Sequence, residues 1–262
     1  MKEVILVKLG GSIITDKSGE KIADLQKIDQ LAQEIKDAQS QTDALFIVGH
    51  GAGSFGHPQA KKYQTTEGNI APESALGHAL VRQAVTELNG LVIKSFTEHG
   101  IAAVTLSPNA FITTGNRQIL TVNTIPLTLM LEQRLVPVIH GDVLMDGAQG
   151  WSISSGETIL NALAERMPAG HRATKIIEVG KTDGVYDENN KTVPLINNEN
   201  FAAIEKQLGD SHGADVTGGM SHKVKEALNL ATKGIPSLLI SAHAGNLEKA
   251  LLGKEVLGTR IE

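Results

Sequence analysis

The chain has 262 residues, of which 41% are hydrophobic and 20% charged, which is typical of a globular protein with a sizeable core. A net charge of −5 and an aromatic content of 3% disfavour a nucleic-acid partner. The absence of cysteine excludes disulfides and thiol chemistry. No apolar run is long enough to span a membrane and the first residues are no signal peptide, so a cytoplasmic protein is expected.

Short apolar runs alternate with amphipathic stretches along the chain. The alternation predicts an α/β fold with a mainly parallel sheet covered on both faces. The long helix is expected to be broken or bent near Gly90, and the polar stretch 167–172 to separate two lobes, 1–170 and 171–262. Buried strands are expected at 4–7, 44–48, 101–106, 135–139, 176–179 and 236–240, and helices at 25–38, 73–99, 156–166, 220–233 and 246–252.

The stretch GHGAGSFGHP at 49–58 has the glycine spacing of a dinucleotide fingerprint. In a dinucleotide site, a second strand ending in an acidic residue follows within about 20 residues. Here His57 and Pro58 are followed by a polar loop at 64–74, with no apolar strand before the long helix. The sequence context therefore argues against a dehydrogenase of the Rossmann type.

Four glycine-containing loops follow expected strands or open expected helices, at residues 8–12, 49–57, 155–157 and 217–223. Glycine lets backbone N–H groups approach an anion closely, and the start of a helix adds a favourable potential. The carboxyl ends of parallel strands share one edge of a sheet, so these loops are expected to converge. Two of them carry lysines, which predicts a site for more than one phosphate and therefore phosphoryl transfer.

Other phosphate and metal motifs are absent from the sequence. Gly180-Lys181-Thr182 looks like the end of a P-loop, but Lys175 stands where that motif needs glycine, and a turn follows at 183–184. No HExxH, CxxC or EF-hand pattern occurs, and no protein-bound metal cage is recognisable.

The motifs resemble those of the amino acid kinase superfamily. The resemblance rests on KLGGS at 8–12, TDGVY at 182–186 and DVTGGM at 215–220. Within that superfamily, the stretch 49–63, the IHGDV at 139–143 and the ending at 250–259 are similar to the isopentenyl phosphate kinases. The resemblance extends through nearly the whole chain.

The resemblance implies a three-layer αβα sandwich, with the phosphoryl acceptor bound by the N-terminal lobe and Mg-ATP by the C-terminal lobe. It also implies a homodimer. The implied reaction converts ATP and isopentenyl phosphate into ADP and isopentenyl diphosphate, in an alternative mevalonate route to isoprenoids. Mg²⁺ would enter with ATP and be held mainly by phosphates and water, with Asp142 and Asp183 orienting it indirectly.

The resemblance also implies roles for individual residues. Lys8 would contact the phosphoryl group in transit, Lys17 and Lys223 the ATP phosphates, and His57 the phosphate of the acceptor. His50 is expected to be structural. Backbone amides of the anion cradle are assigned to Gly11, Ala52, Gly53 and Gly156, and further nucleotide contacts to Gly10, Lys181, Asp183 and Gly218.

Two departures from the family pattern leave questions open. Glu157 replaces the usual aspartate, so its contact could be direct or indirect. Depending on the alignment, Lys181 or Thr182 lies where an acidic residue is usual, and Lys181 could bind phosphate or face solvent. The acceptor's organic tail could lie near Gly77, Ala79, Leu80 and Ala84, where ordinary helix packing is the alternative interpretation.

Two other functions compete with isopentenyl phosphate phosphorylation. A fosfomycin-type phosphonate kinase, or a kinase for another small phosphate monoester, would keep the fold and change the acceptor. An apolar pocket near residues 76–88 would favour a prenyl tail, and a polar or closed one a small phosphonate. The third possibility is a non-catalytic ATP-binding regulator, against which the combination of Lys8, His57 and Lys223 argues.

Overall fold

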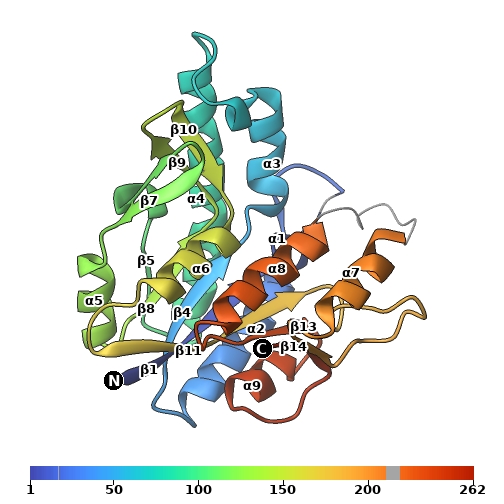
Figure 1. The fold of residues 1–262 in the computed structure, drawn as a ribbon. Coiled ribbons are helices and arrows are strands. Elements are labelled where there is room, and N and C mark those ends of the chain that lie inside the picture. The colour runs from blue at the N-terminus through green and yellow to red at the C-terminus, as the bar shows by residue number, and fades with distance from the viewer. Residues whose placement is uncertain (17, 211–218) are drawn as a thin grey trace.

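The computed structural model describes residues 1–16, 18–210 and 219–262 (Figure 1). Its centre is an eight-stranded sheet in the order β12-β14-β13-β11-β1-β4-β8-β5. The strands from β13 to β5 run parallel to one another, and β14 runs antiparallel to β13. The strands are β1 (Lys2–Leu9), β4 (Leu45–His50), β5 (Ala103–Thr105), β8 (Val136–His140), β11 (His171–Gly180), β12 (Leu195–Ile196), β13 (Ser237–Ser241) and β14 (Gly258–Ile261).

Helices cover both faces of this sheet. One core cluster joins the sheet to α2 (Leu25–Gln39), α4 (Ser74–Glu98) and α9 (Asn246–Leu251). On the other face, which is turned to the viewer in Figure 1, lie α5 (Ile125–Glu132), α6 (Gly156–Glu165) and α8 (Gly219–Ala231). A smaller cluster packs α7 (Phe201–Asp210) and α8 against β13 and β14. The expected three-layer αβα sandwich is therefore confirmed.

The expected strands and helices are all present, with shifted ends. Strand β11 is longer than expected because residues 171–175 also pair with β1. Helix α4 runs through Gly90 without interruption, so the expected break there is wrong. A Cβ added at the exposed Gly90 would meet no atom within 4 Å. That glycine is a locally unfavourable residue that the helix tolerates.

A second, four-stranded sheet in the order β10-β9-β6-β7 was not predicted. It packs against α4 and carries the hairpin of β9 and β10, which leads into α6. The short elements α1 and α3 beside the glycine loops were also missed. The bounds are β6 (Ile112–Gly115), β7 (Gln118–Val122), β9 (Asp142–Asp146), β10 (Gly150–Ser154), α1 (Gly11–Ile14), α3 (Gly53–Lys62), β2 (Thr15–Asp16), β3 (Ile22–Ala23), η1 (Thr65–Glu67) and η2 (Pro108–Ala110).

The expected lobe boundary at 167–172 lies at the start of β11. Since β11 pairs with β1 along its length, one continuous sheet runs through both expected lobes. Among the helices that the structure describes, none is long and apolar enough to cross a membrane.

Candidate active site

The glycine loops converge at the carboxyl edge of the parallel strands. Gly10 follows β1, Gly51 follows β4, Gly141 follows β8 and Lys181 follows β11. All four residues line one cleft of about 1080 Å³. The first residues of α1, α3, α6 and α8 line the same cleft. The described parts of the loops therefore converge as expected from the sequence, and four helices begin at one space, where helix starts favour an anion.

Glycine is needed in these loops because their backbones touch. A Cβ on Gly11 would lie 2.6 Å from the backbone nitrogen of Gly53, and one on Gly51 would lie 2.7 Å from that of Gly11. A Cβ on Gly156 would lie 2.6 Å from the carbonyl oxygen of His50. Gly53 also has a φ of +50°, which L side chains rarely adopt. The first three loops thus form one packed unit, whose geometry depends on missing side chains.

Ala52 can carry a methyl group within this packed unit because its φ is −75°, an ordinary value for a residue with a side chain. Immediately after it begins α3, whose second turn carries His57 into the cleft. Thr15 ties the start of α3 to the first loop, since its hydroxyl donates to the carbonyl of Gly11 and accepts from the N–H of Ser54. The cleft therefore receives His57 and several loop amides from a fixed arrangement.

A buried histidine, His50, contacts the backbone of the glycine loop that follows β4. His50 ends β4, and its Nδ1 lies 3.1 Å from the carbonyl oxygen of Gly51. That oxygen can only accept, so Nδ1 carries the proton, and Nε2 accepts from the side-chain amide of Asn89. Burial, followed by the neighbouring His140, lowers the pKa of His50 to about 3. The ring is therefore a neutral structural group, as expected from the sequence.

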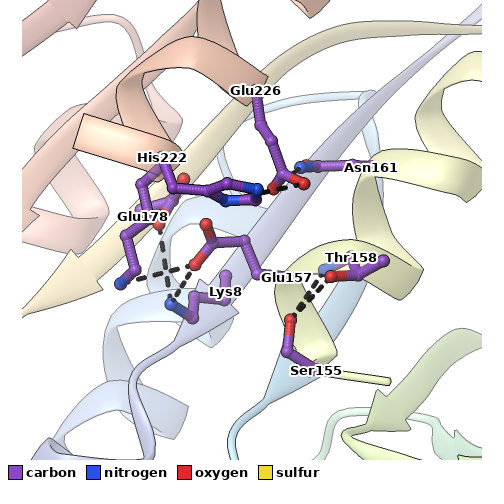
Figure 2. A network of polar contacts seen from close by, with 9 residues as sticks. Lys8, Ser155, Glu157, Thr158, Asn161, Glu178, His222 and Glu226 are labelled. Carbon is purple, nitrogen blue, oxygen red and sulfur yellow. Dashed lines mark hydrogen bonds and ion pairs between the residues drawn. The ribbon is translucent and has the colours of Figure 1, made fainter. Parts of the chain in front are cut away.

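Four charged side chains form a network at the base of the cleft (Figure 2). The Nζ of Lys8 lies 2.8 Å from a carboxylate oxygen of Glu157 and 3.5 Å from one of Glu178. The Nζ of Lys223 lies 3.4 Å from the same Glu157 oxygen. Glu157 thus contacts both lysines directly, which answers the question left open by the sequence.

The network shifts the pKa values of its two carboxylates in opposite directions. Burial raises the pKa of Glu157, but Lys8 and Lys223 outweigh it and hold that pKa below its usual range. Burial and the nearby Glu157 raise the pKa of Glu178, although Lys8 opposes them. Burial lowers the pKa of Lys8, but Glu178 and Glu157 raise it above its usual value. Lys8 and Glu157 are therefore both charged at neutral pH.

The structure brings most of the predicted site residues together. Asp183 does not line the cleft, and its carboxylate accepts a hydrogen bond from the hydroxyl of Ser241. Lys17 and Gly218 lie outside the described residues, so their predicted roles stay predictions. The predicted residues that line the cleft are Lys8, Gly10, Gly11, Ala52, Gly53, His57, Gly156, Lys181 and Lys223.

One end of the cleft has an apolar wall. Val81 and Val85 of α4 line it one helical turn apart, together with Ala60 of α3 and Ile153 of β10. The positions expected to face the acceptor's tail lie elsewhere, so that expectation is wrong in detail. Gly77 is covered by Tyr63, Ala84 belongs to the core, and neither Ala79 nor Leu80 lines the cleft.

The carboxylates at the cleft are engaged by protein groups rather than grouped for a metal. Asp142 accepts from the N–H of Val143 and lies 3.4 Å from the Nε of Arg82. Within the described part of the chain, no three His, Cys, Asp or Glu side chains are placed to hold a metal ion together.

Sequence reasoning missed two residues that shape this site. Glu178 lies within the apolar run of β11, and an acidic residue in a buried strand was an available signal. Asn89 is buried in α4 and fixes the tautomer of His50, but a single asparagine in a helix gives no such signal.

Comparison with known proteins identifies the family. The model of the Amino acid kinase family matches residues 3–241. Isopentenyl phosphate kinases of Methanothermobacter thermautotrophicus and Methanocaldococcus jannaschii are 38% and 34% identical, each over 98% of both chains. A solved isopentenyl phosphate kinase structure superposes with a TM-score of 0.81 at 33% identity, covering 98% of this chain and all of that one. The chain is a kinase that belongs to the amino acid kinase family and, within it, to the isopentenyl phosphate kinases.

Proposed function

We propose that this chain transfers the γ-phosphoryl group of ATP to isopentenyl phosphate. The observation that carries the proposal is the composition of the cleft. Its base holds Lys8, Lys223 and the glycine-loop amides, while its far end is walled by Val81 and Val85. Two phosphates fit the first part, and a short hydrocarbon tail fits the second. These apolar side chains argue against a small phosphonate, which a polar or closed end would favour.

The acceptor phosphate is itself an anionic nucleophile, so the reaction needs no general base. An oxygen of that phosphate attacks the γ-phosphorus in line, and the bond from that phosphorus to the β-phosphate oxygen breaks to release ADP. Catalysis then consists of alignment and charge neutralisation. We assign Lys8 to the phosphoryl group in transit, His57 to the acceptor phosphate, and Lys223 and Lys17 to the ATP phosphates.

The remaining nucleotide and acceptor contacts follow the same division of the chain. Residues 1–170 would bind the acceptor and residues 171–262 the nucleotide. We assign Gly11, Ala52, Gly53 and Gly156 to the cradle of amides, and Gly10, Lys181 and Gly218 to ATP; Asp183, which does not line the cleft, is given no direct contact. Mg²⁺ would neutralise charge on the ATP phosphates, with Asp142 and Asp183 in its outer environment. A homodimer is the proposed assembly.

An acceptor panel tests the proposed function. ADP release from Mg-ATP would be followed with isopentenyl phosphate, dimethylallyl phosphate and fosfomycin as separate acceptors. We expect isopentenyl phosphate to be turned over fastest, and His57→Ala to lower kcat/KM for it by about ten- to a hundredfold, because a hydrogen bond to a charged group is lost. His99→Ala, after the last turn of α4, is the matched control and should behave like the unmodified chain.

Each alternative predicts a different result in this panel. Turnover of fosfomycin alone would assign the chain to phosphonate phosphorylation. ATP binding with no turnover of any acceptor would indicate a non-catalytic nucleotide-binding protein.

A further inference from the structure

Glu178 carries a carboxylate at a buried strand position, where the side chain is normally apolar. It lies in β11 between Ile177 and Val179, and all three residues are buried. β11 is an inner strand of the central sheet, flanked by β1 and β13. Burying a carboxylate is costly unless a charged or hydrogen-bonding partner compensates. The chain therefore bears a cost in stability at this position, and the compensating partner indicates what the side chain does.

That partner is Lys8. In the parallel pairing of β1 with β11, Lys8 and Glu178 are register partners, so both side chains leave the sheet at the same place. The backbone of Glu178 is held by a strand on each side, because Leu239 of β13 is its other register partner. The Nζ of Lys8 lies 3.5 Å from the Glu178 carboxylate, and both residues line the cleft.

The second anchor of Lys8 is shared. Glu157 contacts Lys8 and Lys223 through one oxygen, so an entering phosphate that moves Lys223 also disturbs the Glu157–Lys8 contact. Glu178 forms an ion pair with Lys8, and it lies in the central sheet, whereas Glu157 lies at the start of a helix. It can therefore hold the ammonium group in place while Glu157 and Lys223 adjust to the nucleotide (Figure 2).

We propose that Glu178 is a positioning residue that keeps the ammonium group of Lys8 at the base of the cleft, between the two phosphates that react. The inference rests on the proposed role of Lys8 in phosphoryl transfer. Since Glu178 acts through Lys8 and its own carboxylate repels phosphate, it raises kcat without improving the binding of ATP.

Glu178→Gln tests the proposal because the amide has the size of the carboxylate and removes only the charge. We expect kcat to fall about tenfold, while KM for ATP stays level or decreases, because the interaction lost acts mainly in the transition state. Glu165→Gln is the matched control. Glu165 is the last residue of α6, does not line the cleft and forms an ion pair with Lys233. Its variant should keep kcat within about twofold.

A second readout does not depend on any acceptor. Acetic anhydride labels unprotonated amines, and mass spectrometry resolves the labelled site. Removing the Glu178 charge should lower the pKa of Lys8 and speed its labelling by several-fold, while Glu165→Gln leaves it unchanged. Thermal unfolding would confirm that both variants are folded.

The outcomes separate this inference from the proposed function. A wild-type chain that turns over none of the acceptors contradicts the proposed function, whereas the labelling of Lys8 still tests the Glu178 contact. Unchanged kcat or unchanged Lys8 labelling in Glu178→Gln would overturn the positioning role. A rise in KM for ATP with kcat intact would overturn it as well, because Glu178 would then act on nucleotide binding.

Discussion

The buried His50 is expected to make the fold sensitive to mild acid. Its ring is wholly buried, ties the Gly51 carbonyl to Asn89, and has a pKa of about 3 in the folded chain. In the unfolded chain the same group has the ordinary histidine pKa of 6.5. Because the folded pKa is the lower one, the unfolded state takes up a proton first as the pH falls. The stability that neutral His50 provides is therefore present above its unfolded pKa and is lost below it.

The size of this loss follows from the two pKa values. Each pH unit between them costs about 1.4 kcal/mol. At about pH 5 the folded chain is therefore destabilised by about 2 kcal/mol relative to neutral pH through His50 alone. At about pH 3, where the folded ring itself begins to take up the proton, the loss is about 4 kcal/mol. Burial also lowers the pKa of His140, which adds a loss of the same sign.

Urea unfolding, followed by the fluorescence of the single tryptophan, measures this loss near pH 7 and near pH 5. His50→Asn removes the titrating group while its amide can still donate to the Gly51 carbonyl. The variant will be less stable at both pH values, so the quantity that matters is the difference between them. We expect that difference to be about 2 kcal/mol smaller in the variant. An equal difference in both proteins would show that His50 is not held neutral, and would refute the reasoning.

Three further substitutions probe a glycine loop, an exposed helix position and a buried carboxylate. Gly53→Ala would drive a Cβ into the hydroxyl of Thr15 and hold it in a left-handed backbone conformation, so we expect kcat/KM to fall by more than about tenfold. Gly90→Ala is its control and should raise the free energy of unfolding by about 0.5–1 kcal/mol, since open space surrounds that exposed helix position. Equal kcat/KM values in the two variants would contradict the role of Gly53. Glu34→Ala should lower the free energy of unfolding by about 2–3 kcal/mol, because its buried carboxylate accepts two backbone N–H groups at the start of α9. Urea unfolding would measure it, and a loss below about 0.5 kcal/mol would mean that those amides find other partners.

The sequence was most informative where one physical rule determines the structure. Apolar runs such as residues 44–48 could only be buried strands, and the glycines that follow them marked the edge where the loops meet. The rejection of a dinucleotide site also rested on element order, and the structure agrees with it, since α3, η1 and α4 follow β4 with no strand between them. Lys8 was found because a charged residue at a buried strand end needs a reason, whereas Lys17 and Lys223 were assigned from the family resemblance.

The remaining features depend on tertiary contacts that no local pattern encodes. Helix α3 contains two glycines and Pro58, so its low helix propensity suggested a loop, but packing against α4 stabilises it. The strands of the small sheet are short and partly exposed, as at Met145 and Ile153, and give no clear alternation. Which side chains of α4 face the cleft depends on the rotation of the helix about its axis. Apolar residues occur on several faces of α4, so the sequence did not predict that Val81 would face the cleft.

The central claim is that one phosphate is transferred directly to another in this cleft. Phosphorus NMR of a mixture of the chain, Mg-ATP and isopentenyl phosphate tests it most directly. The account predicts that the isopentenyl phosphate resonance is replaced by the paired resonances of a diphosphate ester, in step with ADP, and that Lys8→Met abolishes this change. Accumulation of ADP and inorganic phosphate, with isopentenyl phosphate left intact, would contradict it.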